Sequence, residues 1–262
     1  MIEQDLKTLE EKSIYIIREA KLKFRNIAAL WSMGKDSTAM LALTRKAFMG
    51  KIPFPVIHID NSVDFPETYT FREYLAKKWN FKVIVGHSEI KQDLVGSACC
   101  GKNKPETLKK IMAQHGFDAL IVSIRRDEHG VRAKERYMSP RDRNFRWKYR
   151  NQPAELWDDY SSKMDTLGHI RVHPLLDWNE LDVWRYIRQE RIPINPLYFS
   201  KNGFRYRSLG CTHCTIALRS NAKTVDDIIK ELRTTKQEER SGRSMDKESE
   251  YAMLRLRSLG YM

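Results

Sequence analysis

The stretch that decides the fold reads Asn26-Ile-Ala-Ala-Leu-Trp31, followed directly by Ser32-Met-Gly-Lys-Asp-Ser-Thr38. Its first six residues are mostly apolar and predict a short buried strand. The polar residues that follow are typical of a loop, and the stretch from Thr38 to Phe48 predicts a helix. A strand, a polar loop and a helix in this order form the first half of a βαβ unit, from which parallel sheets are built.

The same alternation continues along the chain. Strands are predicted after the prolines of 51–60 and at 81–85 and 119–124, and helices at 3–24, 66–79, 106–115, 180–190 and 225–234. We therefore predict an α/β fold with a doubly wound, mostly parallel sheet and a less regular C-terminal extension. Residues 1–200 are expected to form the main domain and residues 201–262 to complete or cover its site.

Composition narrows the class of protein. Of 262 residues, 41% are hydrophobic and 31% are charged, which is typical of a globular protein. Lys and Arg (47) exceed Asp and Glu (34) by 13, which favours anionic partners such as nucleotides, sulfate, nucleic acid or an acidic protein surface. The longest apolar runs are too short to span a bilayer, and the N-terminus lacks the layout of a secretory signal. We expect a cytoplasmic protein without membrane contact.

Polar residues stand at the carboxyl end of each main predicted strand. They are Ser32–Ser37, His58–Ser62 and Ser123–Glu128. Parallel α/β sheets bind ligands at this edge, so these three segments are expected to converge on one site. His58 is expected either to bind a nucleotide or to orient Asp60, with a core histidine as the equal alternative.

The loop at 32–38 has the chemistry of a phosphate site. Gly34 permits close approach of the backbone, and N–H groups at the next helix N-terminus can hold phosphate oxygens. Lys35 adds a positive charge, and Asp36 directly after it excludes a Walker A loop. The hydroxyl groups available there belong to Ser32, Ser37 and Thr38. The alternative is a capped surface turn.

A basic cluster follows the strand at 119–124. Residues 121–150 contain ten Lys or Arg and four Asp or Glu, an excess of 10 − 4 = 6. Arginine binds anionic oxygens through a bidentate, permanently charged guanidinium, so Arg125 and Arg126, with Arg207, are expected to contact the anion. A solvated basic face and a salt-bridged scaffold remain open, as does a nucleic-acid surface at residues 145–150, where aromatic and basic residues alternate.

The cysteines form two close pairs, Cys99-Cys100 and Cys211-x-x-Cys214. Paired thiolates can hold zinc or an iron–sulfur cluster. The alternative is four small buried side chains without a metal.

Several segments together carry a resemblance to a known family. Besides the loop they are Arg45-Lys-Ala-Phe48, Pro53-Phe-Pro-Val-Ile-His-Ile-Asp60, Arg125-Arg-Asp-Glu128, Arg132-Ala-Lys-Glu-Arg136, Pro153-Ala-Glu-Leu-Trp157, Arg207-Ser-Leu-Gly-Cys211, Ser220-Asn-Ala222 and Glu239-Arg-Ser-Gly-Arg243. The chain resembles the PP-loop ATP pyrophosphatases of the phosphoadenylylsulfate reductase family, most of all its sulfate adenylyltransferase small subunits. The resemblance implies an adenine nucleotide α-hydrolase-like fold.

The resemblance also implies a reaction, in which ATP and sulfate give adenylylsulfate and pyrophosphate. The resemblance implies that Ser32, Gly34, Lys35, Asp36, Ser37 and Asp60 bind the nucleotide, and from their own chemistry Thr38 and His58 are expected to join them. The expected catalytic residues are Lys35, Arg125, Arg126 and Arg207. ATP, Mg²⁺ and a GTPase partner subunit are expected, and a homodimer stays open. The alternative is sulfur modification of DNA or tRNA, with a [4Fe–4S] cluster and a cysteine desulfurase partner.

Two features separate the chain from parts of this family. The cysteine pairs Cys99-Cys100 and Cys211-x-x-Cys214 resemble those that bind a cluster in adenylylsulfate reductases, but no cysteine follows Cys214, which disfavours a reductase. Asn61 stands where sulfate-activating subunits typically have Thr, and Asp64 stands where they often have a basic residue.

Overall fold

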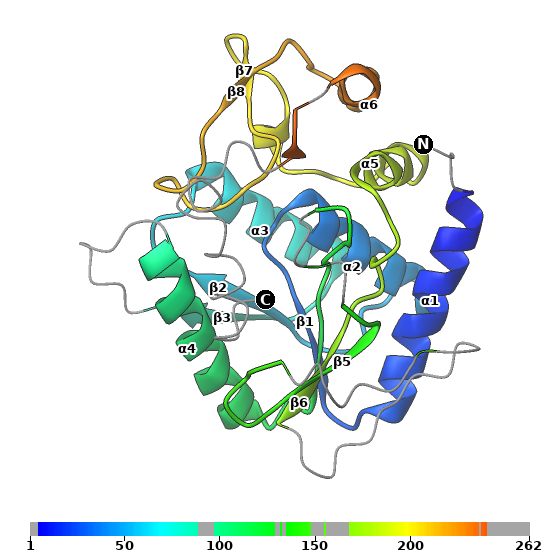
Figure 1. Ribbon diagram of the computed structural model, residues 1–262, viewed down its shortest axis with the longest axis vertical. Helices are drawn as coiled ribbons and strands as arrows, with labels where there is room; N and C mark the ends of the chain where they lie inside the picture. Colours follow the sequence, from blue (N-terminus) through cyan, green and yellow to red (C-terminus); the bar gives the residue numbers. More distant parts are fainter. Residues whose placement is uncertain are drawn as a thin grey trace.

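The main sheet has six strands within the part of the chain that the computed structural model describes (Figure 1). The described residues are 5–88, 97–128, 132, 135–147, 155, 168–235 and 237–239, with side chains omitted for 97–103. The strands are β1 (Ile27–Leu30), β2 (Val56–Asp60), β3 (Val83–His87), β4 (Ala119–Ile121), β5 (Met138–Arg141) and β6 (His169–Val172). Their order is β3-β2-β1-β4-β6-β5, and all neighbours pair in parallel except β5 with β6.

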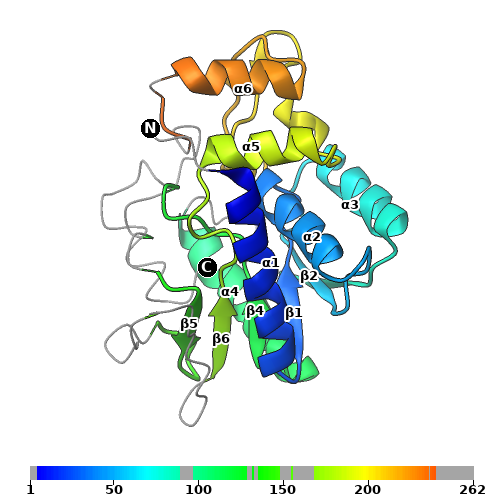
Figure 2. The same cartoon turned by 90° about the vertical axis from the view of Figure 1, so that its right-hand side faces the viewer.

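Helices cover both faces of this sheet. They are α1 (Leu6–Lys23), α2 (Lys35–Ala47), α3 (Pro66–Trp79) and α4 (Ser97–His115). Right-handed crossovers from β1 to β2 and from β2 to β3 put α2 and α3 on one face, where α1 packs beside α2 (Figure 2). The return from β3 to β4 puts α4 on the other face (Figure 1).

The C-terminal elements lie above the carboxyl ends of the strands. They are α5 (Glu180–Gln189), the 3₁₀ turn η3 (Pro196–Tyr198), β7 (Phe204–Arg205), β8 (Leu218–Arg219) and α6 (Val225–Thr234). Capping boxes begin both helices, at Asn179 for α5 and at Thr224 for α6. Figure 2 shows α5 and α6 stacked above α1 and α2, so this part of the chain covers the edge of the sheet at which the parallel strands end.

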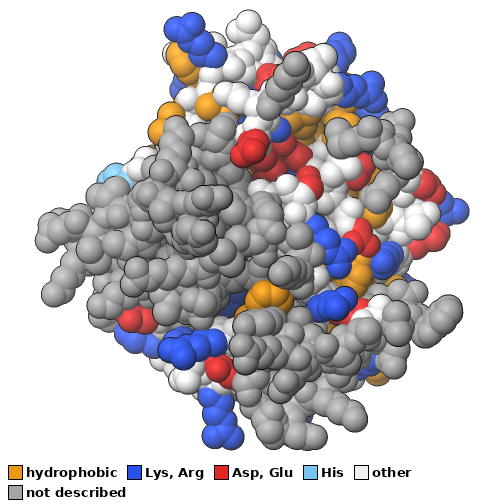
Figure 3. All heavy atoms as spheres, viewed as in Figure 1, with side chains coloured by type: hydrophobic (Ala, Val, Ile, Leu, Met, Phe, Trp, Pro, Cys, Tyr) orange, Lys and Arg blue, Asp and Glu red, His pale blue; other side chains and the backbone are white. Residues whose placement is uncertain are grey.

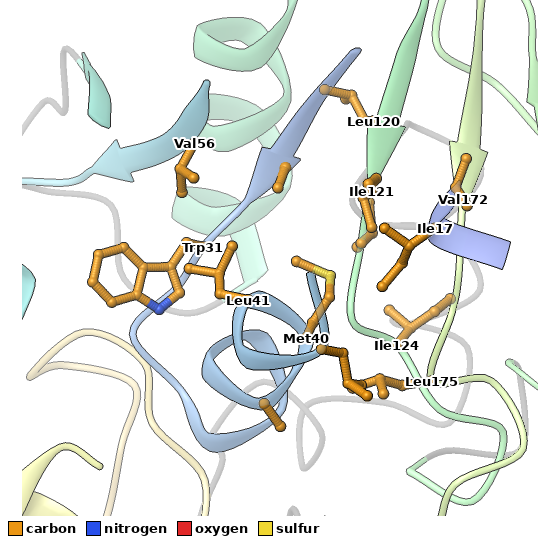
Figure 4. Close-up of a cluster of buried hydrophobic side chains, with 14 of the residues drawn as sticks. Ile17, Trp31, Met40, Leu41, Val56, Leu120, Ile121, Ile124, Val172 and Leu175 are labelled. Carbon is orange, nitrogen blue, oxygen red and sulfur yellow. The ribbon is translucent and has the colours of Figure 1, made fainter. Parts of the chain in front are cut away.

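The core lies between the sheet and the layer of α1 and α2. Figure 4 shows Met40 and Leu41 of α2 beside strand residues such as Val56 and Ile121. All four side chains are fully buried. Each such burial stabilises the fold by roughly 1.5–3 kcal/mol, so this layer fixes α2 on the sheet.

The predicted fold class is confirmed, and α3 and α6 have the predicted bounds. Helix α2 begins at Lys35 rather than at Thr38, so three of the predicted loop residues form its first turn. The sequence analysis missed β5 and β6, because Ser139 and Pro140 interrupt the apolar pattern of β5 and the buried Arg171 interrupts that of β6. The division at residue 200 stays a prediction.

Within the described part of the stretch 145–150, Phe145 does not fit the predicted nucleic-acid surface. Phe145 is buried against His169, with ring centroids 4.3 Å apart, so it is not free to stack on a base. Residues 148–150 lie outside the described part. On the face in Figure 3, the described Lys and Arg side chains alternate with Asp and Glu instead of forming one patch. Among the described helices none is long and apolar enough to cross a membrane.

Candidate active site

The site forms where the sheet reverses direction. Strands β1 and β4 are parallel neighbours, but the chain leaves β1 toward β2 and leaves β4 toward β5 and then β6, on the opposite side. A crevice opens at the carboxyl ends of two strands whose connections diverge in this way. The loop at 32–34 and the segment at 122–128 lie on its two sides, as the sequence predicts.

The loop is shaped by two backbone conformations. Met33 has a φ of 56°, in the left-handed region, and Gly34 is extended and caps α2. A Cβ on Gly34 would lie 3.3 Å from the Ser32 hydroxyl and 3.4 Å from the Tyr198 hydroxyl. Glycine at this position therefore avoids a tight contact with the Ser32 hydroxyl where the loop approaches Tyr198.

The loop hydroxyls divide into two groups. The hydroxyls of Ser32 and Ser37 lie 3.2 Å apart and both border the crevice. The Thr38 hydroxyl instead accepts a hydrogen bond from the Trp31 indole at 3.1 Å, inside the core. Ser32 and Ser37 are positioned to contact a ligand, whereas Thr38 orients the strand that carries the loop.

Helix α2 presents its N-terminus to the crevice. Within the described residues no side chain caps it at Gly34. The backbone N–H of Lys35 donates to the Tyr198 hydroxyl at 2.9 Å. The positive end of the helix dipole and the remaining first-turn N–H groups therefore favour an anion at this point.

Lys35 is only 1% exposed, although it is charged. Its Nζ lies 3.2 Å from Asp36 Oδ2 and 4.0 Å from Glu180 Oε1, and it donates to Glu239 Oε1. Burial alone would lower the pKa of this ammonium, but the carboxylates of Asp36, Glu239 and Glu180 raise it well above its usual range. Lys35 is thus a fixed cation at the start of α2.

Arg125 is the second fixed cation, and it is fully buried. It donates to Asp36 and to Glu239, and its Nε donates to Asp127 at 2.9 Å. Burial opposes the charge, but these carboxylates hold the pKa of Arg125 well above its ordinary value. The segment after β4 therefore brings Arg125 to Lys35 through two shared carboxylates.

Glu239 lies between these two cations, with one carboxylate oxygen on each. Burial would raise the pKa of this carboxyl, but Arg125 and Lys35 hold it well below its usual range. An anionic group is thus already bound where the two cations of the crevice converge.

Arg207 supports the site from the C-terminal part. Its guanidinium contacts the Glu180 carboxylate at 2.7 and 3.1 Å and donates to the Gln237 carbonyl at 2.7 Å. Glu180 in turn lies beside Lys35, and its backbone N–H donates to Asp127 at 2.9 Å. Arg207 therefore acts on Lys35 through Glu180, the first residue of α5, and holds this end of the helix in place.

The structure directs Arg126 away from this cluster. Its guanidinium pairs with Asp177 and donates to the Glu135 carbonyl at 3.2 Å. Carboxylates interleaved with the other basic residues also pair with them, as in Arg132–Glu128 and Arg141–Glu135. Much of the basic cluster is therefore the salt-bridged scaffold that the sequence analysis left open.

A largely apolar cavity of about 150 Å³ adjoins the loop. Its polar lining includes Ser32, Ser37, His58 and Asp64, and its apolar lining includes Leu30, Ile57, Leu108, Val122 and Leu209. A flat heterocyclic ring fits such a lining better than a hydrated ion does. The cavity thus offers a place for a nucleotide base beside the anion-binding loop.

Asp60 anchors the turn after β2. Its Oδ1 accepts from the Ser62 backbone at 2.7 Å and from the Tyr69 hydroxyl at 3.0 Å. The Arg72 guanidinium lies 3.8 Å from its Oδ2. Asp60 therefore shapes the wall of the cavity and is not among its lining residues.

Two of the four cysteines, Cys211 and Cys214, have described side chains, and both are buried. Cys211 and Cys214 form one turn, in which the Cys214 N–H donates to the Cys211 carbonyl at 3.2 Å. The hydrogen bond between the two thiols, with burial, raises the pKa of Cys211, while Lys104 of α4 opposes this rise. Cys99 and Cys100 lie on the first turn of the same helix, and their side chains are outside the described part.

The sequence analysis missed several residues of the site. They are Glu180 and Glu239, which pair with the cations, and Tyr198, whose hydroxyl accepts from the Lys35 backbone N–H. Asp127, which pairs with Arg125, belongs to the salt-bridged scaffold that the sequence analysis left open. Glu239 begins one of the segments that carry the family resemblance, which was its one signal. Tyr198 follows Pro196 and Leu197, and this local sequence gives no indication that its hydroxyl contacts the Lys35 backbone. Lys134, Trp157 and Arg243 themselves lie outside the described residues.

An open parallel sheet with an anion-binding helix N-terminus, two buried cations and an adjacent apolar cavity defines an α/β nucleotide-binding protein. The profile of the phosphoadenosine phosphosulfate reductase domain matches residues 26–217. The chain therefore belongs to this family.

Curated relatives cover nearly the whole chain. Sulfate adenylyltransferase subunit 2 from Aeromonas salmonicida (strain A449) is 40% identical over 296 aligned residues, which cover 98% of this chain and 95% of the relative. The protein of the same name from Psychromonas ingrahamii is 40% identical, with 98% and 97% covered.

The similarity to solved structures supports the fold of this chain but carries no argument about its function. The FMN adenylyltransferase of Candida glabrata in complex with ATP has a TM-score of 0.58 at 18% identity, covering 80% of this chain and 63% of that one. The phosphoadenylyl-sulfate reductase of Candida auris has a TM-score of 0.53 at 17% identity, covering 82% and 99%.

Proposed function

We propose that the chain is an adenylyltransferase that transfers AMP from ATP to sulfate. It carries out this reaction as the catalytic subunit of a sulfate adenylyltransferase, and the nearly full-length similarity to proteins of that name supports this. The structural observation that carries the proposal is the Glu239 carboxylate held between the buried cations Lys35 and Arg125. A site that binds a carboxylate there, at a helix N-terminus, has the charge and donors to bind a phosphate group.

In the proposed reaction a sulfate oxygen attacks the α-phosphorus of MgATP. The bond from that phosphorus to the α,β-bridging oxygen breaks, and the electron pair leaves with pyrophosphate. Mg²⁺ enters with ATP as part of the substrate and neutralises charge on the phosphates. Lys35 and Arg125 stabilise the negative charge that grows on the leaving pyrophosphate. Asp36 and Asp127 hold these cations in place, so the charges need no rearrangement during the reaction.

The neighbouring residues have supporting roles in this proposal. The hydroxyls of Ser32 and Ser37 and the first-turn N–H groups of α2 bind phosphate oxygens, and the apolar cavity takes the adenine. Arg207 acts through Glu180 on Lys35, which makes it a positioning residue. Residues 201–262 complete the site through Arg207 and Glu239.

The names of the relatives number them as one subunit of a larger enzyme, which implies a partner subunit. We propose that this partner is a GTPase that supplies the energy, because adenylylsulfate contains a high-energy mixed anhydride. The cytoplasm supplies ATP and is the proposed compartment. Sulfur modification of nucleic acid is not better supported by the relatives, and the buried Phe145 weighs against a base-stacking surface.

The four cysteines are proposed to bind a metal, as a [4Fe–4S] cluster or as zinc. Cys211 and Cys214 are buried and adjacent, and Lys104 of the helix that carries the other two acts electrostatically on Cys211. When bound, the metal would tie the start of α4 to the turn at 211–214. Metal analysis of anaerobically purified protein tests this: about four iron or one zinc per chain supports it, and a metal-free chain contradicts it.

The reverse reaction tests the proposed function most simply. Adenylylsulfate and pyrophosphate should give ATP, which luciferase detects, because this direction is energetically downhill and needs no partner. ATP formation that depends on both substrates supports the proposal. Sulfate-independent release of pyrophosphate from ATP, with no reverse reaction, would contradict it.

A further inference from the structure

His58 and Asp60 lie two positions apart on β2, so their side chains are on the same face of this strand. Both are buried, with 2% and 6% of the residue exposed. The turn that follows brings Asp64 back beside them, and Ser62 in this turn has a φ of 59°. One imidazole and two carboxylates thus meet at the carboxyl end of the strand.

The geometry of these three side chains fits a single metal ion. Each offers one ligand atom, and the three atoms lie within 4.8 Å of one another, with His58 Nε2 3.9 Å from Asp64 Oδ2. Three such atoms share a point that is at most 4.8 Å divided by √3, or about 2.8 Å, from each of them. Bonds from Zn²⁺ to nitrogen or oxygen are about 2.0–2.2 Å long, so each side chain has to move by less than about 1 Å.

The imidazole has a nitrogen available for this purpose. His58 Nε2 is buried and has no hydrogen-bond partner among the described residues. Leaving such an atom without a partner is unfavourable, so a group that binds to it there gains free energy. Burial, followed by Arg72, lowers the pKa of His58 to about 4, against the opposing effect of Asp60. The ring is therefore uncharged at neutral pH, and the neutral imidazole is the form that binds metal ions.

Asp60 is oriented through one of its two carboxylate oxygens. Its Oδ1 accepts from the Ser62 backbone N–H at 2.7 Å and from the Tyr69 hydroxyl at 3.0 Å. Its Oδ2 has the Arg72 guanidinium and the His87 ring at 3.8 Å each, beyond hydrogen-bond distance. Hydrogen bonds to one carboxylate oxygen orient the other in metal sites, so Asp60 has the arrangement of a positioned ligand.

We propose that His58 Nε2 and the carboxylates of Asp60 and Asp64 bind a divalent transition-metal ion of the class Mn²⁺, Fe²⁺ or Zn²⁺. The nitrogen ligand disfavours Mg²⁺ and Ca²⁺, which prefer oxygen alone, and two carboxylates match the charge of a divalent ion. His58 and Asp64 border the apolar cavity, which gives the ion an entry path and room for water ligands. The inference does not depend on the proposed function, because the chain alone supplies the protein ligands.

Titration with Mn²⁺ in the absence of nucleotide tests the inference. This ion is the probe because it prefers oxygen and nitrogen ligands and is bound poorly by the cysteine thiolates. Electron paramagnetic resonance of the free ion should show one bound Mn²⁺ per chain, and the pulsed spectrum should show coupling to the nitrogen of one imidazole. That coupling should be absent in His58→Gln. The lack of a stoichiometric site, or a coupling that persists in His58→Gln, would overturn the proposal.

Two variants that shift the affinity in opposite directions assign the site to these residues. Asp64→Asn removes a charged ligand and should weaken Mn²⁺ binding at least about 30-fold. Arg72→Gln should tighten it about 5-fold, because the guanidinium 3.8 Å from Asp60 Oδ2 repels a second cation there. A purely structural role of these residues predicts no tighter binding in either variant.

Asp226→Asn at the exposed start of α6 is the matched control and should leave Mn²⁺ affinity unchanged. Thermal melting establishes that each variant is folded. Mn²⁺ affinity that Asp64→Asn leaves unaltered, or that Arg72→Gln fails to raise, would contradict the assignment.

Discussion

The anion site and the apolar cavity differ in whether their polar groups already have partners within the chain. In the anion site, defined here by Lys35, Arg125 and Glu239, each charge already has a partner within the chain. In the apolar cavity, His58 Nε2 has none among the described residues. In the proposed reaction a phosphate would replace the internal carboxylate of Glu239 in the anion site, whereas a base would add contacts to a wall that is already formed.

The largest expected effect comes from removing the fixed cation of α2. Lys35→Met should lower kcat/KM of the reverse reaction about 1000-fold, because a charged donor to the reacting pyrophosphate is lost in a buried site. Lys46→Met is the control on the same helix, since Lys46 is partly exposed and pairs with Glu10 and Glu190. Similar activities of the two variants, with both folded by thermal melting, would remove Lys35 from the mechanism.

The glycine of the loop should matter next. Gly34→Ala places a Cβ 3.4 Å from the Tyr198 hydroxyl and 3.3 Å from that of Ser32, so the Ser32 hydroxyl has to move by a few tenths of an ångström. We expect KM for pyrophosphate to rise about 30-fold, because small displacements of positioned groups are costly. Tyr198→Phe combined with Gly34→Ala should recover part of this loss. No effect of Gly34→Ala would show that the loop backbone does not contact the phosphates.

Removing the negative charge of Glu239 tests whether this carboxylate competes with a phosphate for the two cations of the anion site. Glu239→Gln removes the charge that competes with a phosphate, so pyrophosphate should bind about 10-fold more tightly in calorimetry at low salt. Glu238→Gln, at the exposed neighbouring position, should change little. Weaker binding in Glu239→Gln would mean that the carboxylate positions the cations instead of competing for them.

The same carboxylate predicts the smallest effect, on stability at acidic pH. The pKa of Glu239 lies below its ordinary value of 4.5, so its contribution to stability is present above pH 4.5 and is lost as the pH falls through the lowered value. Lys35, Arg125, Glu180, Asp127 and Tyr198 face it. Thermal melting between pH 6 and pH 3 should show a steeper loss for the unchanged protein than for Glu239→Gln. Parallel curves would contradict this assignment.

Local pattern was enough to predict much of the fold and half of the anion site. Apolar runs followed by polar loops located β1, β2 and β4, and the convergence of strand ends brought Lys35 and Arg125 together. Arg126 could not be separated from Arg125 by composition. Successive side chains of an extended segment point to opposite sides, so only one of two neighbours faces the crevice.

The remainder depends on contacts distant in sequence. Glu239 lies 204 residues from Lys35 along the chain, and no local pattern predicts that they meet. The strand β6 was missed because His169 and Arg171 are buried in it, which reverses the usual relation between charge and exposure. His169 packs its ring against that of Phe145, a contact that only the tertiary structure supplies.

A crystal structure with bound α,β-methylene-ATP tests the central claim most directly. The account predicts that the terminal phosphates lie within hydrogen-bond distance, about 3 Å, of Lys35 Nζ and the Arg125 guanidinium, with the Glu239 carboxylate displaced. A nucleotide bound elsewhere, with Glu239 still between the two cations, would contradict it.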